Sequence, residues 1–353
     1  MVKVLIVDDS AFIRNALSNM LSSDPEITIV GTARDGLEAI EKVQVLKPDI
    51  VTLDVEMPRM DGITALKHLM KTNPIPVIMV SSLTTDGAKA TLEALDLGAV
   101  DFIPKNLSDL SINIVKIKEL LLDKVKHLGR TGVVRRIREG HRLSTIPKEK
   151  AIPHPMAVRT TGERRIGIVS VGTSTGGPRA LQDIIPKLPK DFPAPVVVAQ
   201  HMPASFTGPF AERLNQLSQI MVKEAEEGEP LKPGVVFIAP GYGHMRVSRK
   251  RGIETVISIS ENREEFIYRP SVDALMLSVA EFFPGRALGV ILTGMGNDGL
   301  KGLAAVKKNG GRVFAQNEET CVIYGMPKAV VGAGIVDKIL PIEEMAEEMI
   351  NSV

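Results

Sequence analysis

The feature that most constrains this chain is the alternation of short, apolar, β-branched segments with longer segments of helical period. This alternation is typical of α/β folds in which helices join parallel strands. It occurs twice, from Val2 to about Leu122 and again from Ile166 onward. Because 353 residues exceed the size at which one core usually keeps growing, we predict two α/β domains, each a doubly wound sheet, the second mostly parallel.

The stretch between the two patterns has no strand signal. From about Gly129 to Arg165 prolines and basic residues accumulate and the periodicity fades. We predict domains over residues 1–124 and 166–353, joined by a linker over 125–165. The basic residues of this linker lack interleaved aromatic side chains, so a solvated tether is favoured over a nucleic-acid patch.

Composition excludes several classes of protein. The formal net charge of +1 gives no general attraction to nucleic acid or to anionic membranes. The single cysteine, Cys321, cannot form an intrachain disulfide, which fits a reducing compartment. No signal peptide and no membrane-spanning apolar run are evident. We expect a cytoplasmic protein with no nucleic-acid partner and no direct membrane insertion.

Polar residues follow each predicted strand of the first domain. The strands and the residues after them are Val4–Val7 before Asp8 and Asp9, Ile50–Leu53 before Asp54, Val77–Val80 before Ser81, and Phe102–Ile103 before Lys105. Because the carboxyl ends of parallel strands line one crevice, we expect these polar residues to meet there.

Three carboxylates in one crevice predict a bound cation. Asp8, Asp9 and Asp54 repel one another unless a metal joins them, and oxygen ligands suit Mg²⁺. Asp54 can then attack a phosphoryl donor, while Lys105 neutralises charge on the transferred oxygens and the Ser81 hydroxyl holds another of them. Acidic residues at strand ends also cap helices, but this explanation does not account for the whole set.

The segments VLIVDDS, TLDVEMPRMDG, VIMVSS and DFIPKN resemble, in order and spacing, the receiver domain of bacterial two-component response regulators. The resemblance implies a flavodoxin-like fold with a five-stranded parallel sheet and a phosphoacceptor at Asp54. It also implies Mg²⁺ held by Asp8, Asp9, Asp54 and the backbone carbonyl of Glu56. Ser81, Lys105 and Phe102 are implied as the switch residues, with Phe102 where many receivers carry tyrosine.

The second domain begins with an apolar strand that runs into a glycine-rich turn around Ser174. Gly172, Gly176 and Gly177 permit tight backbone geometry, and Pro178 can start a helix whose amides bind an oxyanion. A phosphate-binding loop, a structural turn and a nucleophile elbow all fit these glycines. Pro178 stands where a phosphate loop normally has a lysine, which disfavours the first.

A nucleophilic serine needs a base, and two histidines lie in the second domain. His201 follows the strand Val196–Ala199, so it can face the same crevice as Ser174. His244 lies in a turn-rich loop and is the second choice. Asp298, after the strand Leu288–Leu292, can orient the imidazole of His201. The chain order Ser, His, Asp differs from that of α/β-hydrolases, which predicts a different fold with convergent chemistry.

The segments GTSTGGP, QHMP and LTGMGNDG resemble the catalytic domain of chemotaxis protein-glutamate methylesterases, and a receiver before that domain is the arrangement of that family. The resemblance implies a triad of Ser174, His201 and Asp298, with Thr175 and Met295 at the oxyanion site. It implies hydrolysis of glutamyl methyl esters on chemoreceptors, and in some members deamidation of glutamine. A histidine kinase is implied as phosphodonor and receptor cytoplasmic helices as substrate, with no cofactor for the hydrolysis.

Three other functions compete with this interpretation. A DNA-binding output would need a basic helix-turn-helix, whereas the second domain alternates strands and helices and ends in an acidic segment, 342–350. A phosphorylation-controlled binding module would make the Ser174 turn purely structural. An esterase for a small metabolite also fits, because a triad does not name its substrate.

Overall fold

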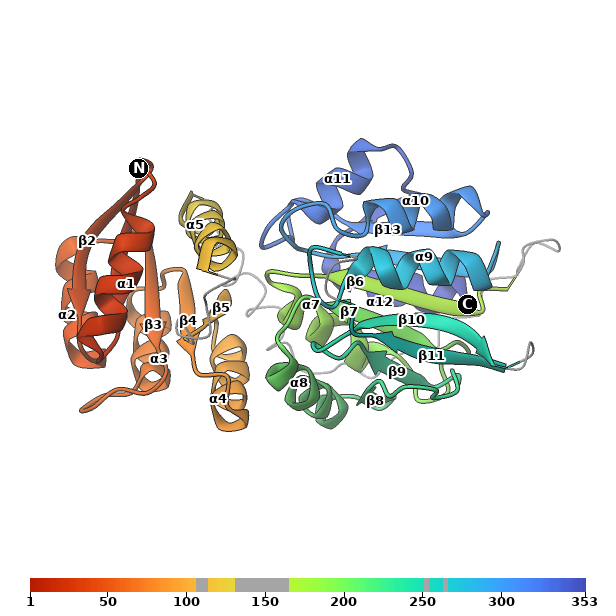
Figure 1. Cartoon of the computed structure of the whole chain (residues 1–353), viewed down its shortest axis with the longest axis horizontal. Coiled ribbons are helices and arrows are strands. Elements are labelled where there is room, and N and C mark those ends of the chain that lie inside the picture. Colours follow the sequence, from red (N-terminus) through yellow and green to blue (C-terminus); the bar gives the residue numbers. More distant parts are fainter. Residues whose placement is uncertain (106–113, 131–164, 251–253, 263–265) are drawn as a thin grey trace. The chain divides into compact units, whose positions relative to one another are not determined.

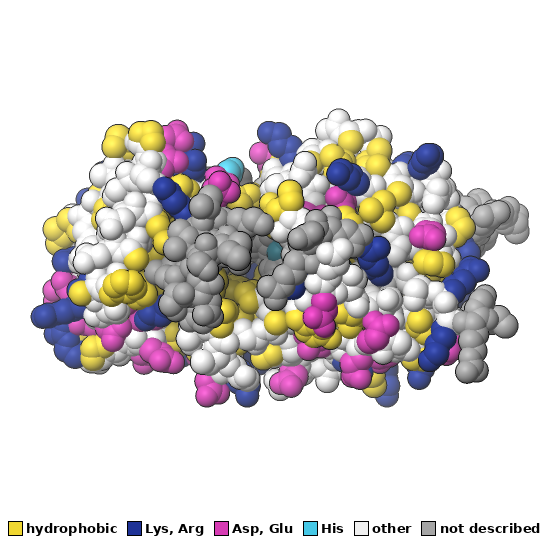
Figure 2. Space-filling model, in the orientation of Figure 1, with side chains coloured by type: hydrophobic (Ala, Val, Ile, Leu, Met, Phe, Trp, Pro, Cys, Tyr) yellow, Lys and Arg dark blue, Asp and Glu magenta, His cyan; other side chains and the backbone are white. Residues whose placement is uncertain are grey.

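The computed structural model describes residues 1–105, 114–130, 165–250, 254–262 and 266–353 (Figure 1). The chain divides into two compact units, Met1–Thr145 and Ile146–Val353. Residues 131–164 of the predicted linker lie outside the described residues. In the described ranges, no helix is both long enough and apolar enough to cross a membrane. On the face shown in Figure 2, acidic and basic side chains are interspersed.

The N-terminal unit contains a parallel five-stranded sheet of order β2-β1-β3-β4-β5, as predicted. Its strands are β1 (Val2–Val7), β2 (Ile27–Ala33), β3 (Ile50–Asp54), β4 (Val77–Ser81) and β5 (Asp101–Pro104). The four strands predicted individually are confirmed to within two residues. The fifth, β2, contains Gly31, where a side chain would meet Leu46; this glycine interrupts the apolar run that would otherwise mark a strand.

Among the described residues, five helices accompany this sheet. They are α1 (Ala11–Leu21), α2 (Gly36–Leu46), α3 (Gly62–Thr72), α4 (Thr85–Asp96) and α5 (Ile114–Arg130). Residues 125–130, which we assigned to the linker, form the end of α5. Val125 and Leu128 are buried there, and Lys126 pairs with Asp24 at 2.8 Å, so packing extends this helix past residue 124. The domain boundaries themselves remain predictions.

The C-terminal unit is built on a seven-stranded parallel sheet of order β14-β13-β12-β6-β7-β9-β8. Its strands are β6 (Ile168–Thr173), β7 (Val196–Gln200), β8 (Met221–Glu224), β9 (Val235–Ile238), β12 (Ala287–Ile291), β13 (Arg312–Gln316) and β14 (Lys338–Leu340). The predicted strands Val196–Ala199 and Leu288–Leu292 are confirmed to within one residue at each end, as β7 and β12. Strands β10 (His244–Lys250) and β11 (Glu254–Ser260), which we did not predict, form a separate antiparallel hairpin.

Helices cover both faces of this sheet, so its central strands are mostly apolar. The helices are α7 (Gly177–Ile184), α8 (Ala204–Leu217), α9 (Val272–Phe282), α10 (Leu300–Lys308), α11 (Met326–Gly332) and α12 (Ile342–Ser352), with a 3₁₀ turn at Ile185–Lys187. In Figure 1, α9 lies in front of the sheet and α12 behind it. Every residue of β6, β7 and β12 is buried, and these strands hold the site described next.

Candidate active site

The residues of the predicted triad follow three adjacent strands. Ser174 comes directly after β6, His201 directly after β7, and Asp298 lies in the loop after β12. In the sheet, β6 and β12 are neighbours. The chain continues from β6 to β7 on one side of this pair and from β12 to β13 on the other side. Parallel α/β sheets bind ligands in the crevice at such a switch point.

Close packing fixes the turn that carries Ser174. Gly176 adopts φ +77°, and a side chain there would meet Val322. A side chain at Gly177 would collide with Gln200, whose amide donates hydrogen bonds of 3.0 Å to the carbonyls of Ser174 and His201. The Ser174 amide itself donates to the carbonyl of Thr293 at 3.1 Å. The serine is thus held half-buried between β7 and the loop after β12.

The imidazole of His201 lies between the serine and the aspartate. Its Nδ1 is 3.1 Å from Ser174 Oγ, and its Nε2 is 2.8 Å from Asp298 Oδ2. Since a carboxylate only accepts, Nε2 carries the proton and the Nδ1 lone pair faces the serine hydroxyl. Turning the ring by 180° about χ2 would place carbons at both positions, so both hydrogen bonds specify this orientation. The nitrogens are used in the opposite sense to the chymotrypsin arrangement.

Asp298 is held ionised by the start of α9. The Ser271 hydroxyl and the amides of Val272 and Asp273 donate to its carboxylate at 3.0, 2.7 and 3.0 Å. Burial alone would raise the pKa of Asp298, but the hydrogen bond from His201 and the backbone donors outweigh it and lower the pKa below its usual value. A charged carboxylate is therefore available to stabilise a protonated imidazole.

Thr293 connects the serine turn to the loop predicted to bind an oxyanion. Its hydroxyl donates to the carbonyl of Thr175 at 2.9 Å and accepts from the amide of Ile323 at 3.0 Å. A side chain on Gly294 would lie 2.9 Å from Ser174 Cβ, so this loop passes directly beside the serine. In the described part of the chain, the amide of Met295 donates to no acceptor. Thr175 is buried and Met295 half-buried.

The second histidine has a different position. His244 is fully buried: its Nδ1 accepts from the Ser271 amide at 3.3 Å, and its Nε2 lies 3.2 Å from the carbonyl of Asn262. It therefore supports the residue that donates to Asp298 and does not contact Ser174. This placement supports the choice of His201 over His244.

Sequence reasoning missed four residues of this site. Tyr268 stacks on His201, Ser271 donates to Asp298, and Thr293 and Gln200 fix the turn. Ser271 carries a readable signal, because a serine before an apolar helical segment is an N-cap pattern, and it caps α9. Nothing local in the sequence marks Tyr268 as a neighbour of His201.

The N-terminal unit brings together the predicted acidic residues. One carboxylate oxygen from each of Asp8, Asp9 and Asp54 lies within 4.8 Å of the others. Lys105 Nζ is 2.6 Å from Asp54 Oδ2, 3.3 Å from Asp8 Oδ2 and 3.9 Å from Asp9 Oδ1. The Oδ2 of Asp8 is buried, and apart from this ion pair with Lys105 it has no hydrogen-bond partner. Oxygen ligands at this spacing, more of them than one lysine can balance, fit a hard divalent cation such as Mg²⁺.

Burial and crowding raise the pKa values of Asp54 and Asp8. Desolvation, together with the charge of Asp8, raises the pKa of Asp54 to about 6 against the opposing effect of Lys105. Desolvation likewise raises the pKa of Asp8. Hydrogen bonds and charge from Asp54 and Asp8 outweigh desolvation at Lys105 and raise its pKa. The pocket thus contains more negative charge than one lysine balances, which again favours a cation.

The other predicted receiver residues lie around this pocket. The buried Ser81 hydroxyl donates to the carbonyl of Gly87 at 3.1 Å, at the start of α4. Phe102 is buried, with Lys124 6.0 Å from its ring centre. The Glu56 amide lies 3.4 Å from Asp54 Oδ1, and the role of its carbonyl stays a prediction.

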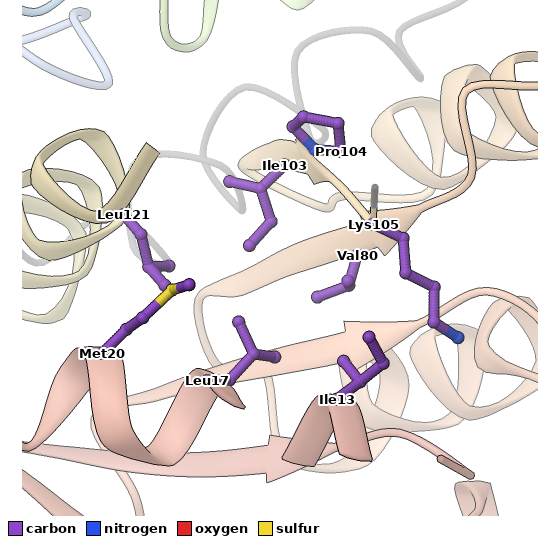
Figure 3. A pocket seen from close by; sticks show the side chains of 8 residues that line it. All are labelled: Ile13, Leu17, Met20, Val80, Ile103, Pro104, Lys105 and Leu121. Atoms are coloured by element: carbon purple, nitrogen blue, oxygen red, sulfur yellow. The ribbon is translucent and has the colours of Figure 1, made fainter. Parts of the chain in front are cut away.

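An apolar pocket lies beside the acidic one, between α1 and α5 (Figure 3). It is lined by Ile13, Leu17, Met20, Val80, Ile103, Pro104, Lys105 and Leu121. The Lys105 ammonium points away from Met20 and Leu121, toward the acids, so only its aliphatic stem contributes to the pocket. Among the described residues that line the pocket, Lys105 is the only charged one.

The comparisons with known proteins agree for both units. The CheB methylesterase family model matches residues 169–349, and the response regulator receiver domain model matches 4–114. A protein of Oleidesulfovibrio alaskensis named protein-glutamate methylesterase/protein-glutamine glutaminase 1 is 50% identical over 100% of both chains. A Pyrococcus horikoshii protein named protein-glutamate methylesterase/protein-glutamine glutaminase is 46% identical, over 100% of this chain and 94% of its own.

A solved structure extends the comparison to three dimensions. The catalytic domain of the Thermotoga maritima CheB methylesterase is 46% identical, with a TM-score of 0.52, and the match covers 54% of this chain and 100% of that one. Both the matched family model and the full-length relatives cover the half of the chain that contains Ser174, His201 and Asp298. The chain belongs to the CheB methylesterase family.

Proposed function

We propose that this chain is a phosphorylation-regulated serine hydrolase that removes methyl groups from glutamyl methyl esters of chemoreceptors and releases methanol. One observation carries the proposal: the hydrogen-bonded series from Ser174 through His201 to Asp298 at 3.1 and 2.8 Å. The names of the full-length relatives support the substrate class.

In the first half-reaction, Ser174 Oγ attacks the ester carbonyl carbon while His201 Nδ1 takes the hydroxyl proton. Asp298, at Nε2, stabilises the imidazolium that forms. Negative charge then develops on the carbonyl oxygen, and the Met295 amide, which has no acceptor among the described residues, is available to bind it beside Thr175. His201 Nδ1 returns the proton to the methoxy oxygen, the C–O bond breaks, and methanol leaves.

In the second half-reaction, water attacks the acyl-serine. His201 Nδ1 takes a proton from this water and passes it to Ser174 Oγ as the acyl bond breaks. The product is a glutamate carboxylate, which adds a negative charge to the substrate helix. The same acyl-enzyme forms from a glutamine side chain with ammonia as leaving group, and the names of the relatives support this second substrate.

The N-terminal unit supplies the regulation. We propose that Asp54 accepts a phosphoryl group from a histidine kinase, with Ser81, Phe102 and Lys105 as the switch residues. Asp8, Asp9 and Asp54 would hold Mg²⁺, together with the carbonyl of Glu56. When bound, Mg²⁺ neutralises charge on the transferred oxygens. The 2.6 Å pair between Lys105 and Asp54 supports the role of the lysine. Phosphorylation changes the access of receptor helices to Ser174.

The test is methanol release from methylated chemoreceptor cytoplasmic fragments by the full chain, with and without acetyl phosphate and Mg²⁺. We expect release by the wild type, none above background with Ser174→Ala, and stimulation by acetyl phosphate that Asp54→Ala abolishes. Ser218→Ala, which removes a half-buried hydroxyl that donates to the carbonyl of Leu214 at the end of α8, outside both sites, controls for a general loss of fold.

Labelling with a fluorophosphonate separates the alternatives. A chain that is labelled at Ser174 but releases no methanol from receptor fragments is a serine hydrolase with another ester substrate, and the receptor assignment fails. A folded chain that is neither labelled nor active is a binding module, and the hydrolase assignment fails as well.

A further inference from the structure

One side chain covers the candidate base without belonging to the triad. Tyr268, in the segment between β11 and α9, stacks on His201 with ring centres 4.4 Å apart and an angle of 11° between the ring planes. Tyr268 is half-buried, and the His201 side chain is only 11% exposed. The tyrosine ring therefore excludes water from one face of the imidazole.

The same side chain also reaches the loop predicted to bind the oxyanion. A side chain at Gly296 would lie 3.2 Å from the Tyr268 hydroxyl, and Gly296 has φ +83°. Three residues further along the chain from Tyr268, Ser271 donates to Asp298. One short segment thus contacts the base, the acid and the loop after β12.

Stacking has two physical consequences for His201. The χ2 torsion of histidine is broad, so hydrogen bonds at the two nitrogens alone leave the ring free to tilt out of line with Ser174 Oγ. A parallel ring against one face restricts that tilt. In addition, the negative face of an aromatic ring attracts a cation, and this attraction strengthens when water is excluded.

We propose that Tyr268 is a positioning residue: its ring keeps His201 Nδ1 in line with Ser174 Oγ and stabilises the imidazolium formed when Nδ1 holds the serine proton. The inference rests on the proposed hydrolase function. It assigns the effect to the aromatic face, since the contact with His201 is ring to ring, and gives the hydroxyl a minor part.

Three variants of the full chain test this assignment: Tyr268→Phe keeps the ring, Tyr268→Leu removes it, and Tyr242→Leu makes the same change at a 42% exposed tyrosine. We expect Tyr268→Leu to lower kcat about tenfold or more with little change in KM, because the interaction acts on the charged transition state. Tyr268→Phe and Tyr242→Leu stay within about threefold of wild type. Fluorophosphonate labelling of Ser174 should likewise be slowed most in Tyr268→Leu and little in Tyr268→Phe and Tyr242→Leu.

A spectroscopic measurement needs no substrate. In chain labelled with ¹³C-histidine, the His201 ring protons should lose their upfield ring-current shift in Tyr268→Leu and keep it in Tyr268→Phe.

If the wild type is labelled by the fluorophosphonate at Ser174 but does not act on receptor fragments, the proposed substrate is wrong, and labelling and NMR still test the role of Tyr268. If Tyr268→Leu does not fold, Tyr268→Met replaces it.

Three results would overturn the inference. One is a kcat and labelling rate in Tyr268→Leu equal to wild type. Another is an equal loss in Tyr268→Phe, which would transfer the role to the hydroxyl. The third is a change confined to KM, which would make Tyr268 a substrate contact.

Discussion

The two units place a buried aspartate at the same point of related sheets, and the two carboxylates behave differently. Asp54 ends β3, and Asp298 lies in the loop after β12; each strand borders the switch point of its sheet, between β1 and β3 or between β6 and β12. They are 2% and 7% exposed. Burial alone would therefore raise the pKa of both.

Their partners account for the difference. Asp298 accepts from two amides, a hydroxyl and an imidazole, and its pKa is lowered. Asp54 has one close cation, Lys105, a distant amide at 3.4 Å, and two acidic neighbours, and its pKa rises to about 6. The edge of a parallel sheet thus provides a place for a carboxylate, and the donors around it decide whether it is a fixed charge or a reactive group.

The largest expected effect on kcat comes from replacing Asp298, the carboxylate that stays ionised. Asp298→Asn should lower kcat by about 10³- to 10⁴-fold, because an amide nitrogen facing Nε2 forces the proton onto Nδ1 and removes the base. Methanol release and fluorophosphonate labelling both measure this. Asp273→Asn is the matched control: Asp273 is also buried and accepts from Gly302 at 2.8 Å. Equal losses in the two variants would show that Asp298 matters only for the fold.

Binding of Mg²⁺ at Asp54, the reactive carboxylate, should depend on pH. A proton on Asp54 competes with Mg²⁺, so with a pKa of about 6 we expect Mg²⁺ to bind the full chain about tenfold more weakly at pH 5 than at pH 7.5. Because the folded pKa exceeds the unfolded one, ionising Asp54 without metal destabilises the fold as pH rises from about 4 through 6. Calorimetric titration measures the affinity. Two results would contradict the pKa assignment. One is an affinity for Mg²⁺ that does not change between pH 5 and pH 7.5. The other is a free energy of unfolding that depends on pH in Asp54→Asn as it does in the wild type.

Removing one hydrogen-bond donor from Asp298 should raise the pKa of its carboxyl group part of the way toward that of Asp54. Ser271→Ala deletes the hydroxyl that caps α9 and donates to Oδ1. We expect a loss of about 1–2 kcal/mol in the free energy of unfolding and a fall in kcat of several-fold, up to about tenfold. Urea unfolding and methanol release report the two effects. Ser271→Thr, which keeps a hydroxyl, should recover most of both.

Sequence predicted the places of these groups better than their surroundings. A strand followed by Asp54 or Ser174 can be recognised locally, because hydrophobic period and glycine turns are properties of neighbouring residues. Three of the donors to Asp298 come from the N-cap and first turn of α9, 25 to 27 residues earlier in the chain. Tyr268 reaches His201 from a loop 67 positions further along. Such contacts depend on sheet order and on the hairpin β10–β11, which no local pattern predicts.

His244 illustrates that limit and gives the smallest predicted effect. Sequence alone left it as the second candidate base, and the structure places it behind Ser271, one step farther from the reaction than Asp298. His244→Gln keeps an acceptor for the Ser271 amide, so kcat should fall by less than about threefold, whereas His201→Gln should lose about 10³-fold or more. Methanol release by both variants measures the contrast. If His244→Gln were as inactive as His201→Gln while remaining folded, the assignment of His201 as the base would be wrong. The assignment of Asp298 as the carboxylate that orients this base would then fail as well.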